Sequence, residues 1–121
     1  AAGLVAKVQA LAPALASAPV FDGTPTNPTE EAVEAALELY RRHGCDGLVA
    51  IGGGSPIDLA KGVALLATHE GSLETYAAIL GGIPKVTAAV APVIAIPTTS
   101  GTGSEVGRAA LITLKDGRKL G

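Results

Sequence analysis

Three consecutive glycines followed by a serine form the part of this sequence best suited to chemistry. They are Gly52, Gly53, Gly54 and Ser55, and they separate an apolar run, 47–51, from a segment with a helical pattern. Glycines let a pyrophosphate approach the backbone, and a helix N-terminus offers unpaired N–H groups and the positive end of its dipole. The segment therefore predicts a phosphate-binding loop, although it matches neither the G-x-G-x-x-G fingerprint nor a Walker loop. The alternative is a tight strand-to-helix turn in which the serine is only an N-cap.

Two charged residues follow on the same predicted helix. Asp58 is a further candidate for contact with a bound nucleotide, with the alternative that it only complements the helix dipole. Lys61 follows on the same helix, and it is either part of the same site or an ordinary cation exposed on the surface.

A second loop, 98–105, is rich in hydroxyl groups and glycine and follows another apolar run. Its candidate ligand-binding side chains are Thr98, Thr99 and Thr102. Hydroxyl groups suit hydrogen bonding to ribose, to phosphate or to the amide of a nicotinamide. One such loop could be a solvated turn, but two at neighbouring strand ends predict a nucleotide cleft.

Metal ligands and catalytic nucleophiles are not predicted in these residues. A metal site needs several converging ligands, whereas His43 and His69 fall at the ends of two different predicted helices. Cys45 has no histidine at a motif distance, so we interpret it as a small apolar residue rather than a nucleophile.

One of the helices that must position these loops is predicted to end near residue 43. Asn27, Pro28 and Glu30 stand where an N-cap, a first-turn proline and an N3 acid would stand. A basic last turn and a glycine at 41–44 indicate its end. Its buried stripe is predicted to be Val33, Ala36, Leu37 and Tyr40.

The remaining elements alternate between helix and strand. Buried strands are predicted at 47–51 and 92–96, because both are apolar runs too short for helices. A short strand is expected at Val20–Phe21, and a hairpin at 108–114 with its turn at 115–117 and a second arm from 118. Helices are expected at 4–15 with a kink at Pro13, from 55 to 68 or 69, and at 73–80.

This alternation predicts an α/β fold with a mainly parallel sheet, helices on both of its faces, a Rossmann-like arrangement, and a terminal β-hairpin. Ligands of such sheets bind at the carboxyl ends of the strands, where both glycine-containing loops lie.

Composition excludes several classes of protein. The chain has 121 residues, 48% hydrophobic and 17% charged, so it is expected to fold as one domain rather than to be disordered. The net charge of −2 provides no positive electrostatic field that would attract nucleic acid, and no apolar run approaches the roughly 20 residues that span a membrane.

A single cysteine excludes an internal disulfide, and the absence of methionine indicates that processing or fragmentation removed the start. No secretory signal is visible, so a cytoplasmic location is expected.

Two segments together resemble the signatures of the iron-containing (group III) alcohol dehydrogenase family. They are 52–61, GGGSPIDLAK, and 96–106, IPTTSGTGSEV. The resemblance covers nearly the whole chain and includes 27–29, NPT, and Lys119. One departure is Gly107, where family members often have threonine.

The resemblance implies that the glycine–serine loop holds the pyrophosphate of NAD or NADP. Gly54 and Ser55 would take that role, and Thr98 and Thr99 would lie against the cofactor. Asn27 and Lys119 would also approach it. The predicted cofactor-binding residues are Asn27, Gly53, Gly54, Ser55, Asp58, Thr98, Thr99, Thr102 and Lys119.

By the same resemblance, residues 1–121 would be part of the dinucleotide-binding domain of an NAD(P)-dependent alcohol dehydrogenase. A divalent metal, iron or zinc, would be held by a helical domain outside these residues, so the residues alone are expected to be inactive. The substrate would be a small alcohol or carbonyl compound, and a homo-oligomer is expected. Alternatives are a maleylacetate reductase, a glycerol dehydrogenase, a dehydroquinate synthase, or a nucleotide-binding module without catalysis.

Overall fold

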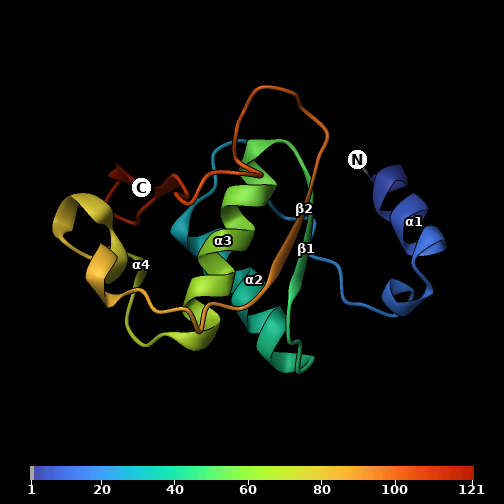
Figure 1. Ribbon diagram of the computed structural model, residues 1–121, viewed down its shortest axis with the longest axis horizontal. Helices are drawn as coiled ribbons and strands as arrows, with labels where there is room; N and C mark the ends of the chain where they lie inside the picture. Colours follow the sequence, from blue (N-terminus) through green and yellow to red (C-terminus); the bar gives the residue numbers. More distant parts are fainter. Residues whose placement is uncertain (1) are drawn as a thin grey trace.

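The computed structural model describes residues 2–121, in which helices pack beside a short parallel sheet (Figure 1). No helix in this range combines the length and the apolar character needed to cross a bilayer. In chain order the elements are α1 (Ala2–Leu11), η1 (Pro13–Leu15), α2 (Glu30–Arg42), β1 (Leu48–Gly52), α3 (Gly54–Thr68), α4 (Leu73–Tyr76), η2 (Ala78–Leu80), η3 (Ile83–Lys85), β2 (Val93–Pro97), β3 (Ile112–Thr113) and β4 (Lys119–Leu120).

Helix α2 confirms the predicted stripe but begins later than its predicted cap. Val33, Ala36 and Leu37 are buried, and Tyr40 is half-buried. The N-cap is Thr29, whose hydroxyl accepts a hydrogen bond from the N–H of Ala32 at 3.2 Å. The prediction of Asn27 as the N-cap was therefore wrong, because a threonine two residues later offers the same type of oxygen in the capping geometry. Glu30 is consequently the first helical residue, not the third.

Strands β1 and β2 run parallel, with Leu48 opposite Val93 and Gly52 opposite Pro97. Both strands lie within one residue of their predicted positions. Parallel strands need a long crossover connection between them, and α3 with the short helices that follow it supplies that crossover.

Helix α3 is the centre of the molecule, packing on α2 and on both strands. One face contributes Leu59, Val63 and Leu66 to a core shared with α2 and the C-terminal strands. The other face places Ile57 and Ala60 against Ala50 of β1. A helix buried on two faces explains why its sequence is apolar nearly all round.

The C-terminal strands form the expected hairpin, although it is shorter than predicted. Ile112 pairs with Leu120 and Thr113 with Lys119 in antiparallel register. The first arm is only two residues long, so the prediction of a strand from 108 was wrong. Thr113 donates its N–H to the carbonyl of Pro28 at 2.9 Å, which joins the hairpin to the start of α2.

Three predictions near the N-terminus and after α3 need correction. Pro13 ends the first helix rather than kinking it, because α1 stops at Leu11 and a separate 3-10 turn follows. Val20–Phe21 is irregular backbone, since no strand among residues 2–121 pairs with it. The predicted helix at 73–80 is divided into α4 and the 3-10 turn η2.

Candidate functional site

The two predicted loops leave the sheet side by side. They follow β1 and β2, whose last residues, Gly52 and Pro97, are paired. The N–H of Thr98 donates to the carbonyl of Gly52 at 2.8 Å, so the second loop starts against the first. In Figure 1 the second loop then arches over the start of α3.

The start of α3 has no side-chain cap. Its N-cap is Gly53, which has no side chain to accept the N–H groups of the first turn, in contrast to Thr29 on α2. The serine alternative was therefore wrong, because the hydroxyl of Ser55 donates instead to the carbonyl of Thr26. The first-turn N–H groups of α3 are free of a cap and carry the positive end of the helix dipole.

The three glycines of the first loop differ in what an added side chain would meet. Gly52 has φ +147°, and a Cβ there would lie 2.7 Å from Cγ of Pro56. A Cβ on Gly53 would lie 3.2 Å from Oγ1 of Thr99. A Cβ on Gly54 would lie 3.6 Å from Cβ of Thr102, which is ordinary contact. Any side chain at the second or third glycine would occupy the space between the two loops.

The threonines of the second loop are exposed. The hydroxyls of Thr98 and Thr99 have no hydrogen-bond partner among residues 2–121, whereas Oγ1 of Thr102 accepts the N–H of Ser104 at 3.4 Å. The first two hydroxyls are therefore available to a ligand.

Asp58 and Lys61 join α3 to the second loop and its continuation. Oδ1 of Asp58 accepts the hydroxyl of Ser104 at 2.6 Å, and Oδ2 accepts the N–H of Leu111 at 3.2 Å. Nζ of Lys61 lies 3.6 Å from Oδ1 of Asp58 and donates to the carbonyl of Ala109 at 2.9 Å. Both side chains are 18% exposed, so Lys61 is not the plain surface cation considered as its alternative.

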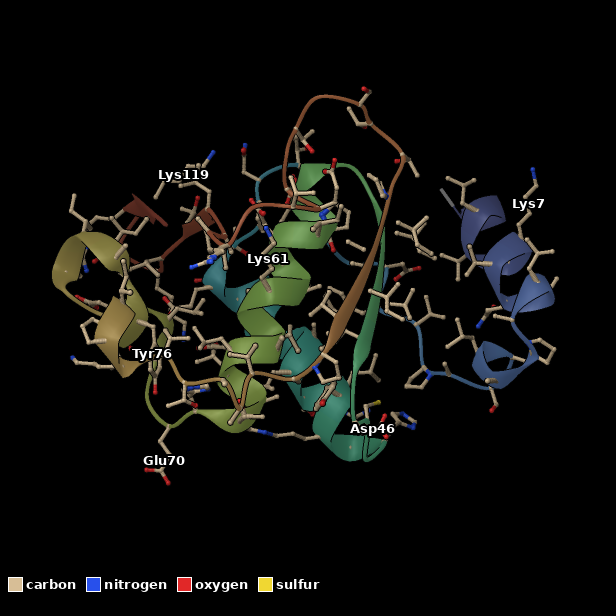
Figure 2. The ribbon with its side chains drawn as sticks, in the orientation of Figure 1. Lys7, Asp46, Lys61, Glu70, Tyr76 and Lys119 are labelled. Atoms are coloured by element: carbon tan, nitrogen blue, oxygen red, sulfur yellow. The ribbon has the colours of Figure 1, made fainter. Side chains whose placement is uncertain are left out.

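Asn27 and Lys119 meet although they are far apart in sequence. Nζ of Lys119 donates to Oδ1 of Asn27 at 3.1 Å. Asn27 follows Thr26, the residue that holds Ser55, so this pair is connected to the first loop. In Figure 2, Lys119 lies on the side of the molecule away from α1, and Lys61 lies near the middle, on α3.

The predicted cofactor-binding residues thus fall into two groups: those of the two facing loops, and those held by hydrogen bonds to distant segments, which are Ser55, Asp58, Asn27 and Lys119. The loop residues Gly53, Gly54, Thr99 and Thr102 approach one another directly. Sequence reasoning missed Ser104 and Thr26 as partners of Asp58 and Ser55, because hydrogen bonds between distant segments leave no local pattern.

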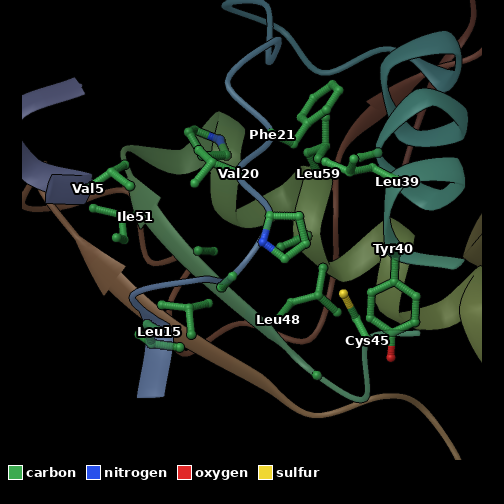
Figure 3. Close-up of a pocket in the computed structure, with 18 of the residues that line it drawn as sticks. Val5, Leu15, Val20, Phe21, Leu39, Tyr40, Cys45, Leu48, Ile51 and Leu59 are labelled. Carbon is green, nitrogen blue, oxygen red and sulfur yellow. The ribbon is translucent and has the colours of Figure 1, made fainter. Parts of the chain in front are cut away.

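A separate apolar pocket of about 240 Å³ lies beside β1 (Figure 3). None of the predicted cofactor-binding residues lines it. Residues of α1 line one side of the pocket, and Phe21, Tyr40 and Cys45 are among the residues that line the rest of it. Burial, with smaller contributions from Cys45 and Asp46, raises the pKa of the Tyr40 hydroxyl above its usual value.

Within residues 2–121, no three His, Cys, Asp or Glu side chains gather where a metal ion could be held. His43 caps the C-terminus of α2, while His69 accepts the N–H of Thr87 at 2.9 Å. The described residues therefore do not fit a divalent metal.

Comparison with known proteins supplies the context for these loops. The family described as iron-containing alcohol dehydrogenase matches residues 1–121. A 4-hydroxybutyrate dehydrogenase of Cupriavidus necator is 68% identical over 102 residues, and a 1,3-propanediol dehydrogenase of Citrobacter freundii is 46% identical over 94 residues. These alignments cover 84% and 78% of this chain, but 27% and 23% of the relatives.

A solved structure extends the similarity to three dimensions. The sulfoacetaldehyde reductase of Bifidobacterium kashiwanohense, solved with NAD⁺, has a TM-score of 0.77 and 35% identity to this chain. The match covers 94% of this chain and 30% of that protein. With the family match spanning every residue, the chain belongs to the iron-containing alcohol dehydrogenase family.

Proposed function

We propose that residues 1–121 are the dinucleotide-binding part of an NAD(P)-dependent, metal-assisted alcohol dehydrogenase. The observation that carries this proposal is the uncapped start of α3, which faces a loop of exposed threonines at the ends of two paired strands. The NAD⁺ complex of a structural relative supports a dinucleotide as the ligand. In the longer protein, β1 and β2 would belong to a wider, Rossmann-like parallel sheet with helices on both faces.

The residues present fit the pyrophosphate of NAD(P) at this position. Gly53 and Gly54 leave room between the loops, and the uncapped N–H groups of the first turn of α3 would donate to phosphate oxygens. Thr98 and Thr99 would donate or accept with their free hydroxyls, and Ser55 would hold the first loop through Thr26. Thr102 would form the wall opposite Gly54.

Asn27, Lys119 and Asp58 complete the proposed set. The ammonium of Lys119, fixed by the side chain of Asn27, would supply positive charge near the negatively charged cofactor. Asp58 would contribute by holding the second loop in place.

When bound, NAD(P)⁺ accepts a hydride from an alcohol, and its reduced form returns one to a carbonyl compound. The residues described here would bind and orient the dinucleotide. A divalent metal would require ligands outside residues 2–121, from a separate helical domain. A homo-oligomeric, cytoplasmic enzyme remains our expectation.

For the substrate, we propose a short alcohol, with 4-hydroxybutyrate as the first compound to test. The 68% identity to the Cupriavidus necator 4-hydroxybutyrate dehydrogenase favours this choice. The alternative of a nucleotide-binding module without catalysis predicts dinucleotide binding but no turnover.

The test is calorimetric titration of NAD⁺ and NADP⁺ into the protein expressed from its complete reading frame. Reduction of the cofactor is then followed with 4-hydroxybutyrate, 1,3-propanediol and ethanol. We expect saturable binding and metal-dependent turnover. Binding without turnover on any alcohol would favour the module, and no binding would contradict the proposal.

A further inference from the structure

One carboxylate holds two separate points of the chain after β2. The two oxygens of Asp58 accept hydrogen bonds from different partners, the Ser104 hydroxyl at 2.6 Å and the Leu111 N–H at 3.2 Å. Hydrogen bonds to an ionised group in a partly buried setting are stronger than neutral ones. Asp58 therefore fixes the second loop at Ser104 and again where the chain approaches β3.

Lys61, one helical turn later, holds a third point. Its ammonium donates to the carbonyl of Ala109 at 2.9 Å and lies 3.5 Å from the hydroxyl of Ser104. The ion pair with Asp58 keeps both side chains, each 18% exposed, from being buried as uncompensated charges.

The segment 98–111 has little else to define its shape. It contains no helix or strand, and its internal backbone hydrogen bonds are two short turns from the carbonyl of Gly103. Gly101 and Gly103 have φ values of +96° and +70°, in the region that favours glycine. Because glycine has no side chain, both positions also give the segment conformational freedom when nothing holds it. The N–H of Thr98 fixes the start of the segment on the carbonyl of Gly52. Beyond that point, the contacts from α3 to Ser104, Ala109 and Leu111 are the main restraint on where the loop lies.

We propose that Asp58 and Lys61 are positioning residues for the dinucleotide, acting through the second loop without touching the ligand. They hold 104–111 on α3, which keeps Thr99 and Thr102 opposite Gly53 and Gly54. Loss of this clamp lets the loop move, and the dinucleotide must then order it on binding. This inference rests on the proposed function.

The experiment compares Asp58→Asn and Lys61→Met with a matched ion pair on the surface. That pair is Glu34 with Lys115, whose Nζ–Oε1 distance is 3.0 Å and whose side chains are 48% and 56% exposed. Controls are Glu34→Gln and Lys115→Met. Each protein, expressed from its complete reading frame, is studied by hydrogen exchange without ligand and by calorimetric titration with NAD⁺.

We expect the Leu111 amide to exchange about ten-fold faster in Asp58→Asn and the NAD⁺ Kd to rise about ten-fold, while amides of α2 keep their protection. Lys61→Met should raise the Kd about three-fold, and Lys61→Arg should restore it, because a guanidinium can still donate to Ala109. Neither control should change exchange in 98–111 or the Kd. Ser104→Ala, which removes one half-buried hydroxyl and its hydrogen bond to Asp58, provides the same test if Asp58→Asn does not fold.

Two results would overturn the inference while leaving the proposed function intact. One is faster loop exchange with an unchanged Kd. The other is a raised Kd with unchanged exchange, which would mean that Asp58 contacts the dinucleotide directly. Wild-type protein that binds no NAD⁺ would instead contradict the proposed function and this inference together.

Discussion

The ammonium of Lys119 donates a hydrogen bond to the side-chain carbonyl of Asn27, joining two residues that are 92 positions apart. Lys119 lies on β4, and Asn27 precedes the cap of α2. Beside it, the carbonyl of Thr26 accepts the hydroxyl of Ser55. The C-terminal hairpin and the first loop are thus linked through one short segment, 26–27.

This link predicts that Lys119 and Asn27 act as a unit in dinucleotide binding. Lys119→Met should raise the NAD⁺ Kd about ten-fold, because a cation beside the phosphates is lost. Asn27→Ala should cost less, since the ammonium remains but is no longer fixed. Calorimetry on the two single variants and the double variant measures the coupling. Strictly additive effects would show that the hydrogen bond has no role in binding.

Gly54→Val should abolish dinucleotide binding without unfolding the protein, and Gly54→Ala should weaken it. A Cβ at this position makes ordinary contact with Thr102 at 3.6 Å, so the fold tolerates it. The added side chain nevertheless occupies the space between the loops. Thermal melting and calorimetric titration together check this, and unchanged affinity in the valine variant would refute the phosphate-loop assignment.

Gly52→Ala is the contrasting substitution in the same loop. At φ +147°, with Pro56 2.7 Å from the new Cβ, alanine should destabilise the fold by about 1–3 kcal/mol. Chemical denaturation measures the free energy of unfolding. Wild-type stability would mean that the backbone here adapts more readily than the packing indicates.

Gly62→Ala should destabilise the protein although alanine is the better helix former. The helical gain is about 1 kcal/mol, whereas overpacking a core costs about 1–3 kcal/mol. The new Cβ would lie 2.8 Å from Cδ1 of Ile112, which can rotate, and 3.3 Å from Cγ2 of fully buried Val33, which cannot. Gly3→Ala on α1, with no atom within 4 Å, is the control and should be neutral or slightly stabilising. A more stable Gly62→Ala variant would show that Val33 and Ile112 can shift to accommodate the added methyl group.

Asp116 gives the hairpin turn a defined pH dependence. Its carboxylate accepts the N–H of Arg118 at 3.0 Å and the guanidinium Nε at 2.7 Å, and these bonds lower the pKa of Asp116 below its ordinary value. Because the pKa is lower in the folded state, these hydrogen bonds contribute their full stability above the pKa of Asp116 in the unfolded chain. That stability is lost as the pH falls through the pKa of Asp116 in the folded protein. Nuclear magnetic resonance of the Arg118 amide should titrate with a midpoint below that of a free aspartate. Asp116→Asn should remove the step, and a midpoint at the ordinary value would contradict the account.

Local patterns predicted the elements whose stabilising contacts repeat along the chain. The stripe of α2 and the apolar runs of β1 and β2 have a period or a length that the sequence displays directly. Short elements were less predictable, because Val20–Phe21 needs a partner strand to become a strand, and none pairs with it in the described chain.

In the candidate site, too, features set by local sequence could be predicted and those set by tertiary contacts could not. Glycines at a strand end indicate the first loop, and its apposition to the second follows from parallel pairing. The alternative that Ser55 is only a helix cap was wrong, and nothing nearby in sequence shows that the carbonyl of Thr26 accepts its hydroxyl. The clamp of Asp58 on Ser104 and Leu111 depends on tertiary contacts and could only be found in three dimensions.

The most direct test is a crystal structure of the protein, expressed from its complete reading frame, with NAD⁺ bound. The account predicts pyrophosphate oxygens about 2.7–3.2 Å from the backbone nitrogens of Gly54 and Ser55, with Thr98 or Thr99 in contact with the cofactor. A dinucleotide seated elsewhere, for example in the apolar pocket beside β1, with the start of α3 facing only solvent, would contradict it.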